Sequence, residues 1–316
     1  MKIVVTGAAG FIGSHLSESL ARAGHEVVGI DAFTDFYDVR LKEENAAAAR
    51  EAGAVVHRLD LATDDLVSAV AGAGAVFHLA AQPGLSARTT FDHYVKNNIL
   101  ATQSLMTALD RAGAKPRFIN IATSSVYGVQ ATGDEATVPT PTSVYGVTKL
   151  AAEQLVLARQ REGTLDACSL RIFSVYGPRE RPDKFYARLI RSILEGTEIP
   201  LHEGSERHTR SFSFIGDIVR GVTAVFDQWE TARGEIFNIG TDVESTTGEG
   251  LALVEKLTGQ KAKIVHVPKR AGDQLRTCAN IGKARRLLGY APQTSLEEGL
   301  RAEIEWFRKK LGTAAS

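Results

Sequence analysis

The chain has 316 residues, of which 44% are hydrophobic and 23% charged, and its formal net charge is zero. That size and composition are typical of a globular enzyme with one large domain or two interleaved ones. The balanced charge gives no overall field that would attract nucleic acid, and no apolar stretch approaches the roughly 20 residues of a membrane-spanning helix.

The first strand-like segment begins at Lys2, which leaves no room for a signal peptide. The two cysteines, Cys168 and Cys278, are too few for a disulfide framework and form no metal-ligand spacing. We therefore expect a cytoplasmic protein without a metal site. His15 and His78 are expected to pack and hydrogen-bond locally rather than to bind metal.

Short β-type segments alternate with helical segments in the first half of the chain. Several β-type segments are apolar throughout, as expected for parallel strands covered on both faces. The alternation predicts an α/β fold with a doubly wound, Rossmann-type parallel sheet. The expected strands are Lys2–Thr6, Glu26–Ile30, Ala54–Arg58, Ala75–Leu79, Arg117–Ala122 and Leu165–Arg171. The expected helices are Phe11–Ala23, Arg40–Ala52, Asp64–Ala71, Thr90–Ala112 and Val144–Glu162.

The pattern loosens in the second half of the chain. We predict a Rossmann domain over residues 1–173 and a smaller region, mainly 174–316, that folds over the sheet edge where ligands bind. The strand expected near 235–239 should return to the main sheet. The elements expected here are a helix at Asp217–Trp229 and strands at Glu235–Ile239 and Lys263–Val267.

A glycine-rich turn follows the first strand and opens the first helix. Glycine permits the tight turn and lets backbone N–H groups approach a pyrophosphate at the positive end of the helix. The turn therefore predicts a dinucleotide-binding loop. Its residues are Gly7, Gly10, Phe11, Ile12 and Gly13.

The residues after the second and third strands indicate which dinucleotide binds. Asp31 ends the second strand, where a carboxylate accepts both ribose hydroxyls of an adenosine and repels a 2′-phosphate. Ala32 and Phe33 follow, with no Arg or Lys to neutralise that phosphate, so we predict NAD rather than NADP. Asp60 and Leu61 would suit the adenine edge, although Asp60 suits a helix N-cap nearly as well.

Tyr145 and Lys149 lie four residues apart on an expected helix and so share one face. A free tyrosine hydroxyl has a pKa near ~10, and an ammonium beside it lowers that pKa toward the neutral range. The pair could therefore take a proton from a sugar or alcohol hydroxyl. The same spacing also occurs by chance on solvated helix faces.

Together with these residues, the chain resembles the extended short-chain dehydrogenase/reductase family, specifically its nucleotide-sugar epimerases and dehydratases. The resemblance covers essentially the whole chain. It is carried by the glycine loop, His78-Leu-Ala-Ala-Gln82, Ala122-Thr-Ser-Ser-Val-Tyr-Gly128, Tyr145-x-x-x-Lys149 and Arg171-Ile-Phe-Ser-Val-Tyr-Gly-Pro-Arg179.

The resemblance implies a catalytic triad of Thr123, Tyr145 and Lys149, with Tyr145 as base at the sugar C4 hydroxyl. The related 4,6-dehydratases carry an Asp-Glu pair where this chain has Ser124 and Ser125, so dehydration is disfavoured. In the alternative interpretation, the hydroxyl groups of Thr123, Ser124 and Ser125 have no catalytic role and only hydrogen-bond backbone groups at the end of the strand. Lys149 is also implied to bind the nicotinamide ribose, and further cofactor contacts are implied for Leu79, Ala80, Ala81 and Gln82.

Within the family, two segments resemble UDP-glucuronate 4-epimerases: Asp31–Lys42 and Gly177–Asp183. If the sugar is a uronate, its 4-keto form readily loses carbon dioxide. Hydroxyl donors such as Thr123 and Ser125 could hold the carboxylate near the ring plane and prevent that loss. The implied UDP-sugar contacts are Ser124, Ser125, Arg88, Ser174, Arg179, Arg210, Arg270 and Asp273, with Arg276 as an alternative phosphate ligand.

Three other functions stay open: a UDP-glucose 4-epimerase, a UDP-glucuronate decarboxylase, and a catalytically dead NAD-sensing scaffold. Such scaffolds usually lack the tyrosine or the lysine, and this chain has both. Family members commonly form homodimers through two helices, here Thr90–Ala112 and Val144–Glu162. Internal packing explains the amphipathic character of both helices equally well.

Overall fold

A sheet of seven parallel strands forms the centre of the protein, in the order β12-β7-β5-β4-β1-β2-β3. The computed structural model describes residues 1–84, 89–269 and 275–314. The chain builds one half of the sheet outward from β1 to β3 and then returns to β4 beside β1, so a crevice opens at the carboxyl ends of β1 and β4. The strands are β1 (Lys2–Thr6), β2 (Glu26–Asp31), β3 (Val55–Arg58), β4 (Ala75–His78), β5 (Arg117–Thr123), β7 (Ala167–Ile172) and β12 (Ile236–Ile239).

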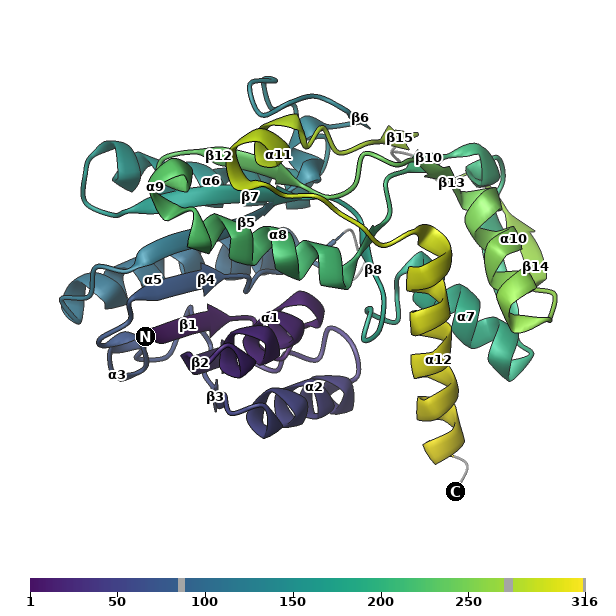
Figure 1. The fold of residues 1–316 in the computed structure, drawn as a ribbon, viewed down its shortest axis with the longest axis horizontal. Coiled ribbons are helices and arrows are strands. Elements are labelled where there is room, and N and C mark those ends of the chain that lie inside the picture. The colour runs from purple at the N-terminus through teal and green to yellow at the C-terminus, as the bar shows by residue number, and fades with distance from the viewer. Residues whose placement is uncertain (85–88, 270–274, 315–316) are drawn as a thin grey trace.

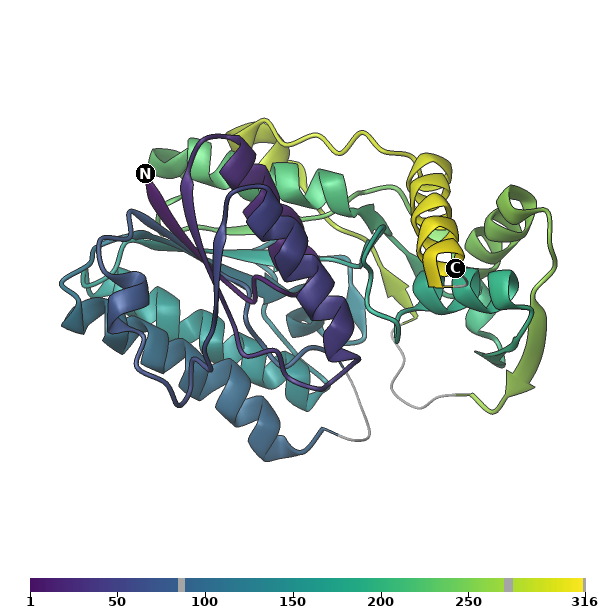
Figure 2. The same cartoon turned by 90° about the horizontal axis from the view of Figure 1, so that it is seen from below.

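Helices cover both faces of this sheet (Figures 1 and 2). One face carries α1 (Phe11–Arg22), α2 (Val39–Glu51) and α8 (Ile215–Asp227), with α9 (Trp229–Ala232) and α11 (Gly282–Leu288) at the β12 edge. The other face carries α3 (Val67–Val70), α5 (Ala101–Arg111) and α6 (Val144–Arg161). Each face has its own apolar cluster, so the strands are buried on both sides.

A smaller group of elements lies beside the sheet rather than on it (Figure 1). It has a separate apolar cluster that includes Tyr186, Ile190, Val254, Leu300 and Ile304. Its elements are α7 (Phe185–Glu195), α10 (Thr247–Thr258), α12 (Leu296–Ala314) and the parallel strands β9 (Glu198–His202) and β14 (Lys263–Val267).

Short strands connect the two groups. A four-stranded sheet joins elements from both halves of the chain. In a separate two-stranded sheet, one strand comes directly after β7 in the sequence. These strands bring segments of the second half to the carboxyl end of the large sheet, where the crevice opens. They are β6 (Gln130–Ala131), β10 (Thr209–Arg210), β13 (Ser245–Thr246) and β15 (Arg276–Thr277), and the pair β8 (Val175–Tyr176) with β11 (Ser213–Phe214). Two 3₁₀ turns, η2 (Ser124–Tyr127) and η3 (Ser205–Arg207), complete the connections.

The predicted α/β class with a doubly wound parallel sheet is confirmed, and β12 pairs with β7 in that sheet. The division at residue 173 stays a prediction. One predicted helix differs: Thr90–Ala112 is not a single α-helix but α4 (Phe91–Tyr94), a π-helical segment η1 (Val95–Leu100) and α5. Another, Asp64–Ala71, shortens to α3, and the side chains of Asp64 and Asp65 accept hydrogen bonds from the backbone N–H groups of Asp60 and Val67 at its start.

No helix in the described ranges is both long and apolar enough to cross a membrane. Across the same residues, no three or more His, Cys, Asp and Glu side chains come together as metal ligands could. His15 and His78 each hydrogen-bond within the protein, to Pro178 O in the first case and to Thr6 and Thr102 in the second.

Candidate active site

The glycine loop is held against β2 and β4 with very little space. Gly7 has a φ of +71°, and a Cβ added there would lie 2.9 Å from the backbone N of Ala80. A Cβ on Gly13 would lie 2.1 Å from Gly7 O, so neither position accepts a side chain. Gly10 caps α1 without a side-chain hydrogen bond. The first N–H groups of α1 therefore stay open to an anion, at the positive end of the helix dipole.

Asp31 ends β2 beside this loop, as predicted. Its Oδ2 accepts a hydrogen bond from Ala9 N at 3.0 Å and its Oδ1 accepts one from Phe33 N at 2.7 Å. Each carboxylate oxygen keeps a second acceptor site for a ribose hydroxyl. The local sequence did not reveal Arg58, which lies 4.1 Å over the Phe33 ring and pairs with Glu43.

The run from Leu79 to Gln82 forms the opposite wall of the crevice. The Oγ1 of Thr6 accepts from the N–H groups of Leu79 and Ala80, both at 3.1 Å. Asp60 caps the turn after β3 through Ala62 N at 2.9 Å and accepts a hydrogen bond from Lys96 Nζ at 2.7 Å. Asp60 therefore caps a turn and not a helix, since α3 begins later with Leu66 at its N-cap. Burial raises the pKa of the Asp60 carboxyl, and hydrogen bonds from Lys96 and Ala62 outweigh that effect and lower it.

Thr123, Tyr145 and Lys149 come together where β5 meets α6. Ser143 caps α6 by accepting from Gly146 N at 3.1 Å, which fixes the first turn of the helix. A Cβ on Gly146 would lie 2.7 Å from Ser125 O, so only glycine lets the helix approach the η2 turn this closely. Thr123 ends β5, and its Oγ1 donates to Ser125 Oγ at 3.3 Å. The contact between helix and turn therefore brings together the three residues of the triad that the family resemblance implies.

The environment of Tyr145 has opposing effects on its phenolate, and burial, which disfavours it, is the largest of them. Burial raises the pKa of Tyr145, while a hydrogen bond with the Thr123 side chain and the positive charge of Arg181 lower it. The sequence pattern predicts that Lys149 supplies that lowering charge. In the structure, the Lys149 ammonium instead donates to Ile121 O at 2.6 Å.

Lys149 is buried, and burial lowers its pKa to about 8 despite the opposing effect of Glu153. A base of about this pKa changes charge close to neutral pH. His78 lies near enough for the Lys149 charge to act on it, and burial together with that charge lowers the pKa of His78 to about 3. His78 is therefore neutral beside a cationic lysine.

Asn98 is a site residue that sequence reasoning missed. It lies in the π-helical segment η1, where its Oδ1 accepts from Gln82 N at 2.7 Å and its Nδ2 donates to Thr148 Oγ1 at 2.9 Å. It thereby ties the cofactor-side wall to the catalytic helix. The sequence signal that could have indicated this residue was the pair Asn97-Asn98 inside a predicted helix. The structure shows this segment as π-helical, and π-helical turns are frequent at functional sites.

The arginines of the 177–183 loop have different partners. Arg179, with a φ of +70°, forms an ion pair with Glu18 of α1. Arg181 was not predicted, yet its charge reaches Tyr145, and Asp183 holds it through hydrogen bonds of 3.0 and 2.9 Å. Its guanidinium lies 5.6 Å over the Phe36 ring, so it joins the acidic and aromatic stretch after β2 to the site. Arg181 is thus the cation of this loop that acts on Tyr145.

The remaining predicted contacts lie on the short connecting strands or outside the described residues. Ser174 follows β7 and its carbonyl accepts from Ser213 N at 2.8 Å. Arg210 lies in β10, and its charge acts on Lys184. Arg276 pairs with Glu244 at 2.7 Å. Arg88, Arg270 and Asp273 are outside the described residues.

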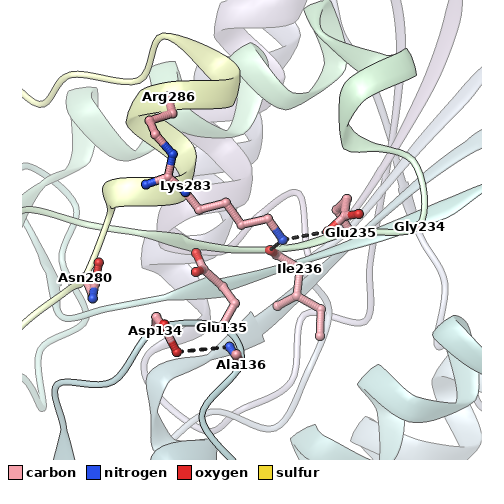
Figure 3. A pocket seen from close by; sticks show the side chains of 9 residues that line it. All are labelled: Asp134, Glu135, Ala136, Gly234, Glu235, Ile236, Asn280, Lys283 and Arg286. Atoms are coloured by element: carbon pink, nitrogen blue, oxygen red, sulfur yellow. Dashed lines mark hydrogen bonds and ion pairs between the residues drawn. The ribbon is translucent and has the colours of Figure 1, made fainter.

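A cavity of about 510 Å³ lies at the β12 edge of the sheet, away from these residues (Figure 3). The loop after β6, the start of β12 and α11 line it, and Lys283 crosses it to reach Glu235 Oε2 at 2.6 Å and Ile236 O at 2.8 Å. None of the predicted site residues lines this cavity.

The crevice fits a dinucleotide and an alcohol that is oxidised. The glycine loop offers an unhindered helix N-terminus for phosphates, and Asp31 offers acceptors for ribose hydroxyls. Beyond them, a tyrosine linked to a threonine hydroxyl lies next to a buried lysine and an arginine. Such a site can remove a proton from a hydroxyl group and later return it.

Comparison with known proteins agrees with this geometry. Residues 3–240 match the model of the family described as "NAD dependent epimerase/dehydratase family". A Bacillus subtilis protein named as an uncharacterized UDP-glucose epimerase, YtcB, is 40% identical over 311 residues, covering 97% of this chain and 98% of its own. UDP-glucuronate 4-epimerase 2 of Arabidopsis thaliana is 33% identical, covering 97% of this chain and 76% of its own.

Among solved structures, UDP-glucuronic acid 4-epimerase from Bacillus cereus superposes with a TM-score of 0.92 at 38% identity. The match covers 98% of this chain and 100% of that one. The Bacillus cereus protein was crystallised in complex with UDP-glucuronic acid and NAD. Its likeness thus extends over the Rossmann sheet and the smaller group of elements beside it.

Asp31→Asn should lower the amount of NAD that copurifies with the protein by about tenfold or more, since a hydrogen bond to a charged group contributes about 1.5–3 kcal/mol. Chromatography of the nucleotide released on denaturation measures it. Asp35→Asn, an exposed carboxylate in the following loop, is the matched control and should retain the wild-type amount. Equal NAD content in wild type and Asp31→Asn would contradict the role of this carboxylate.

Proposed function

Because the chain belongs to the NAD dependent epimerase/dehydratase family, we propose that it is an NAD-dependent UDP-hexose 4-epimerase that interconverts UDP-glucuronate and UDP-galacturonate. The observation that carries this proposal is the setting of Tyr145, where burial raises the pKa and the Thr123 side chain and the charge of Arg181 lower it. It combines a C4 acid-base pair with a charge suited to a sugar carboxylate. The free thiols and the absence of a spanning helix among the described residues support a cytoplasmic location.

In the proposed reaction, NAD would be held by the glycine loop and Asp31, and when bound it supplies reversible hydride acceptance at C4. Tyr145, as phenolate, takes the proton of the C4 hydroxyl while Thr123 hydrogen-bonds the same oxygen. The 4-keto sugar turns in the crevice, and Tyr145 returns the proton after reduction on the other face. Lys149 stays cationic, with its ammonium anchored on Ile121 O, and would bind the nicotinamide ribose, while Arg181 supplies the charge that favours the phenolate.

The residues after β5 argue against a dehydratase. Ser124 and Ser125 begin the η2 turn, where they supply hydroxyl groups and no carboxylic acid. Elimination of water needs an acid and a base, and these two positions supply neither. The same hydroxyl groups could hold a C6 carboxylate in the ring plane and so protect the 4-keto acid from decarboxylation.

A UDP-glucose 4-epimerase is the second candidate, favoured by the name of the Bacillus subtilis relative. The two functions share every step at C4 and differ in the group at C6. Arg181 favours the uronate, because its guanidinium has N–H donors beyond those bound to Asp183 and donates a stronger hydrogen bond to a carboxylate than to a neutral hydroxymethyl group. A UDP-glucuronate decarboxylase would share the carboxylate site and differ only in its product.

We further propose that the protein is a homodimer formed by α4, η1 and α6. These elements pack against one another and expose four large apolar side chains: Phe91, Leu100, Val144 and Val147. Leu100 and Val147 are 51% and 50% exposed, which is costly for a helix face in water unless a partner covers it. A second copy of the same face would bury them in an isologous interface.

The purified protein, without added NAD, should convert UDP-glucuronate into an isomer of equal mass, and UDP-glucose poorly. Tyr145→Phe should lower this turnover about 10²- to 10⁴-fold, the contribution of an acid-base group. Tyr290→Phe, a buried tyrosine bonded to Gly240 O, serves as the control. Chromatography with mass spectrometry resolves the products. A product lighter by carbon dioxide would show a decarboxylase, and conversion of UDP-glucose alone would favour the second candidate.

Arg181→Met should lower kcat/KM for UDP-glucuronate about 10- to 100-fold, since it removes a charge-assisted hydrogen bond to the carboxylate. Any residual turnover of UDP-glucose should fall by a smaller factor, because Arg181 also lowers the pKa of Tyr145. Arg188→Met, an exposed arginine of α7, controls for loss of positive charge. If both substrates lost the same factor, Arg181 would act on Tyr145 and not on the sugar carboxylate.

Leu100→Glu should convert the dimer into a monomer, because a charged side chain would be buried in the interface. Light scattering after size-exclusion chromatography measures the mass. Leu287→Glu changes an exposed leucine of α11 and should leave the dimer intact. A wild-type protein that is monomeric at every concentration tested would refute the interface.

A further inference from the structure

A buried ion pair lies directly behind the catalytic lysine. Glu153 follows Lys149 by four residues on α6, so the two side chains share one helix face. Arg171 of β7 binds the Glu153 carboxylate twice, through Nη2 to Oε1 at 2.7 Å and through Nε to Oε2 at 3.1 Å. The side chains are 2% exposed for Arg171 and fully buried for Glu153.

The pair is enclosed by further hydrogen bonds. Ser169 Oγ donates to Glu153 Oε2 at 3.0 Å, and Arg171 Nη1 donates to Tyr127 OH at 2.9 Å. Tyr127 OH in turn donates to Asn238 Oδ1 at 2.8 Å. The carboxylate therefore accepts three hydrogen bonds and has one fixed position.

Such a pair is a poor source of net stability. The cost of removing both charges from water offsets most of their attraction, and a well-packed apolar pair often serves as well. Its specific consequence is a fixed negative charge close to Lys149, in a region where that charge is little screened. Of the two members, the anion lies on the lysine's own helix and the cation lies behind it.

We infer that Glu153 is a positioning residue of the active centre: its carboxylate, fixed by Arg171, keeps Lys149 cationic inside the protein. This inference rests on the proposed function only in assigning Lys149 its role beside Tyr145. Without the anion, a buried lysine would lose its proton at neutral pH, and the site would lose the cation that Lys149 places there.

The other groups around Lys149 cannot supply this charge. His78 of β4 is neutral at working pH, and on α6 itself Tyr145 must alternate between its two forms. Tyr94 of α4 lies against the ring of Tyr145, with ring centres 6.5 Å apart, and Tyr127 of η2 is bonded to Arg171. Lys96 of η1 is paired with Asp60. Among the described groups that face Lys149, Glu153 is the anion.

The test is to measure the ionisation of Lys149 directly, by NMR titration of protein labelled with ¹³C at the lysine ε carbons, with Lys149→Met to assign the signal. Glu153→Gln should move the titration of Lys149 to lower pH by about one unit or more. In turnover, the alkaline limb of the kcat profile should move by the same amount, with KM for the UDP-sugar little changed.

Three variants separate this role from a purely structural one. Glu153→Asp keeps the charge, so Lys149 should titrate in this variant at a pH close to that of the wild type. Glu153→Gln/Arg171→Met removes both charges, which avoids an unpaired buried arginine. In this double variant, Lys149 should titrate at a pH between those of the wild type and Glu153→Gln. Glu135→Gln changes a glutamate at the far end of the same hydrogen-bond chain, beside the cavity of Figure 3, and should match wild type.

An unchanged Lys149 titration in folded Glu153→Gln, or in the double variant if the single one does not fold, would overturn the inference. The NMR measurement needs no turnover, so it stands apart from the proposed function. A shifted Lys149 titration in a protein inactive on every UDP-sugar would refute the epimerase and leave the role of Glu153 intact.

Discussion

The contact of α6 with the β5 and β7 strands is the constraint on which the active centre depends. The ion pair between Glu153 and Arg171 joins the middle of the helix to β7, and Gly146 lets its first turn lie against Ser125. Because a helix is rigid over this length, fixing these two points also fixes Lys149 between them and Tyr145 next to Gly146. A small displacement of the helix would separate the tyrosine from Thr123, which belongs to a different element.

Burial is the second physical influence on the site. It raises the pKa of Tyr145 and lowers those of Lys149 and His78, so each group is moved away from its charged form. The charges that counteract burial come from Arg181 for the tyrosine and from Glu153 for the lysine. The two groups of the acid-base pair thus depend on counter-charges from separate parts of the chain.

The second half of the chain supplies what the Rossmann sheet lacks. Arg181 lies in the loop after β8 and is oriented by Asp183, while Arg179 of the same loop pairs with Glu18 on the helix behind the glycine turn. One loop therefore connects the cofactor side of the crevice to the substrate side. Arg179 and Arg181 are only two positions apart, yet their guanidinium groups have different partners, because Arg179 has a left-handed backbone conformation.

Local patterns in the sequence determined the parts of this protein that depend on neighbouring residues. The glycine turn, Asp31 at the end of β2, the strand-helix alternation and the Tyr145–Lys149 spacing are all readable because each acts over a few residues along one element. Only the tertiary structure decided which arginine acts on Tyr145, that Asn98 links two walls of the crevice, and that Glu153 faces Arg171. The residues that these contacts join lie 16 to 50 positions apart in the sequence. No periodicity encodes them, because they arise from the packing of separate elements around a shared buried volume.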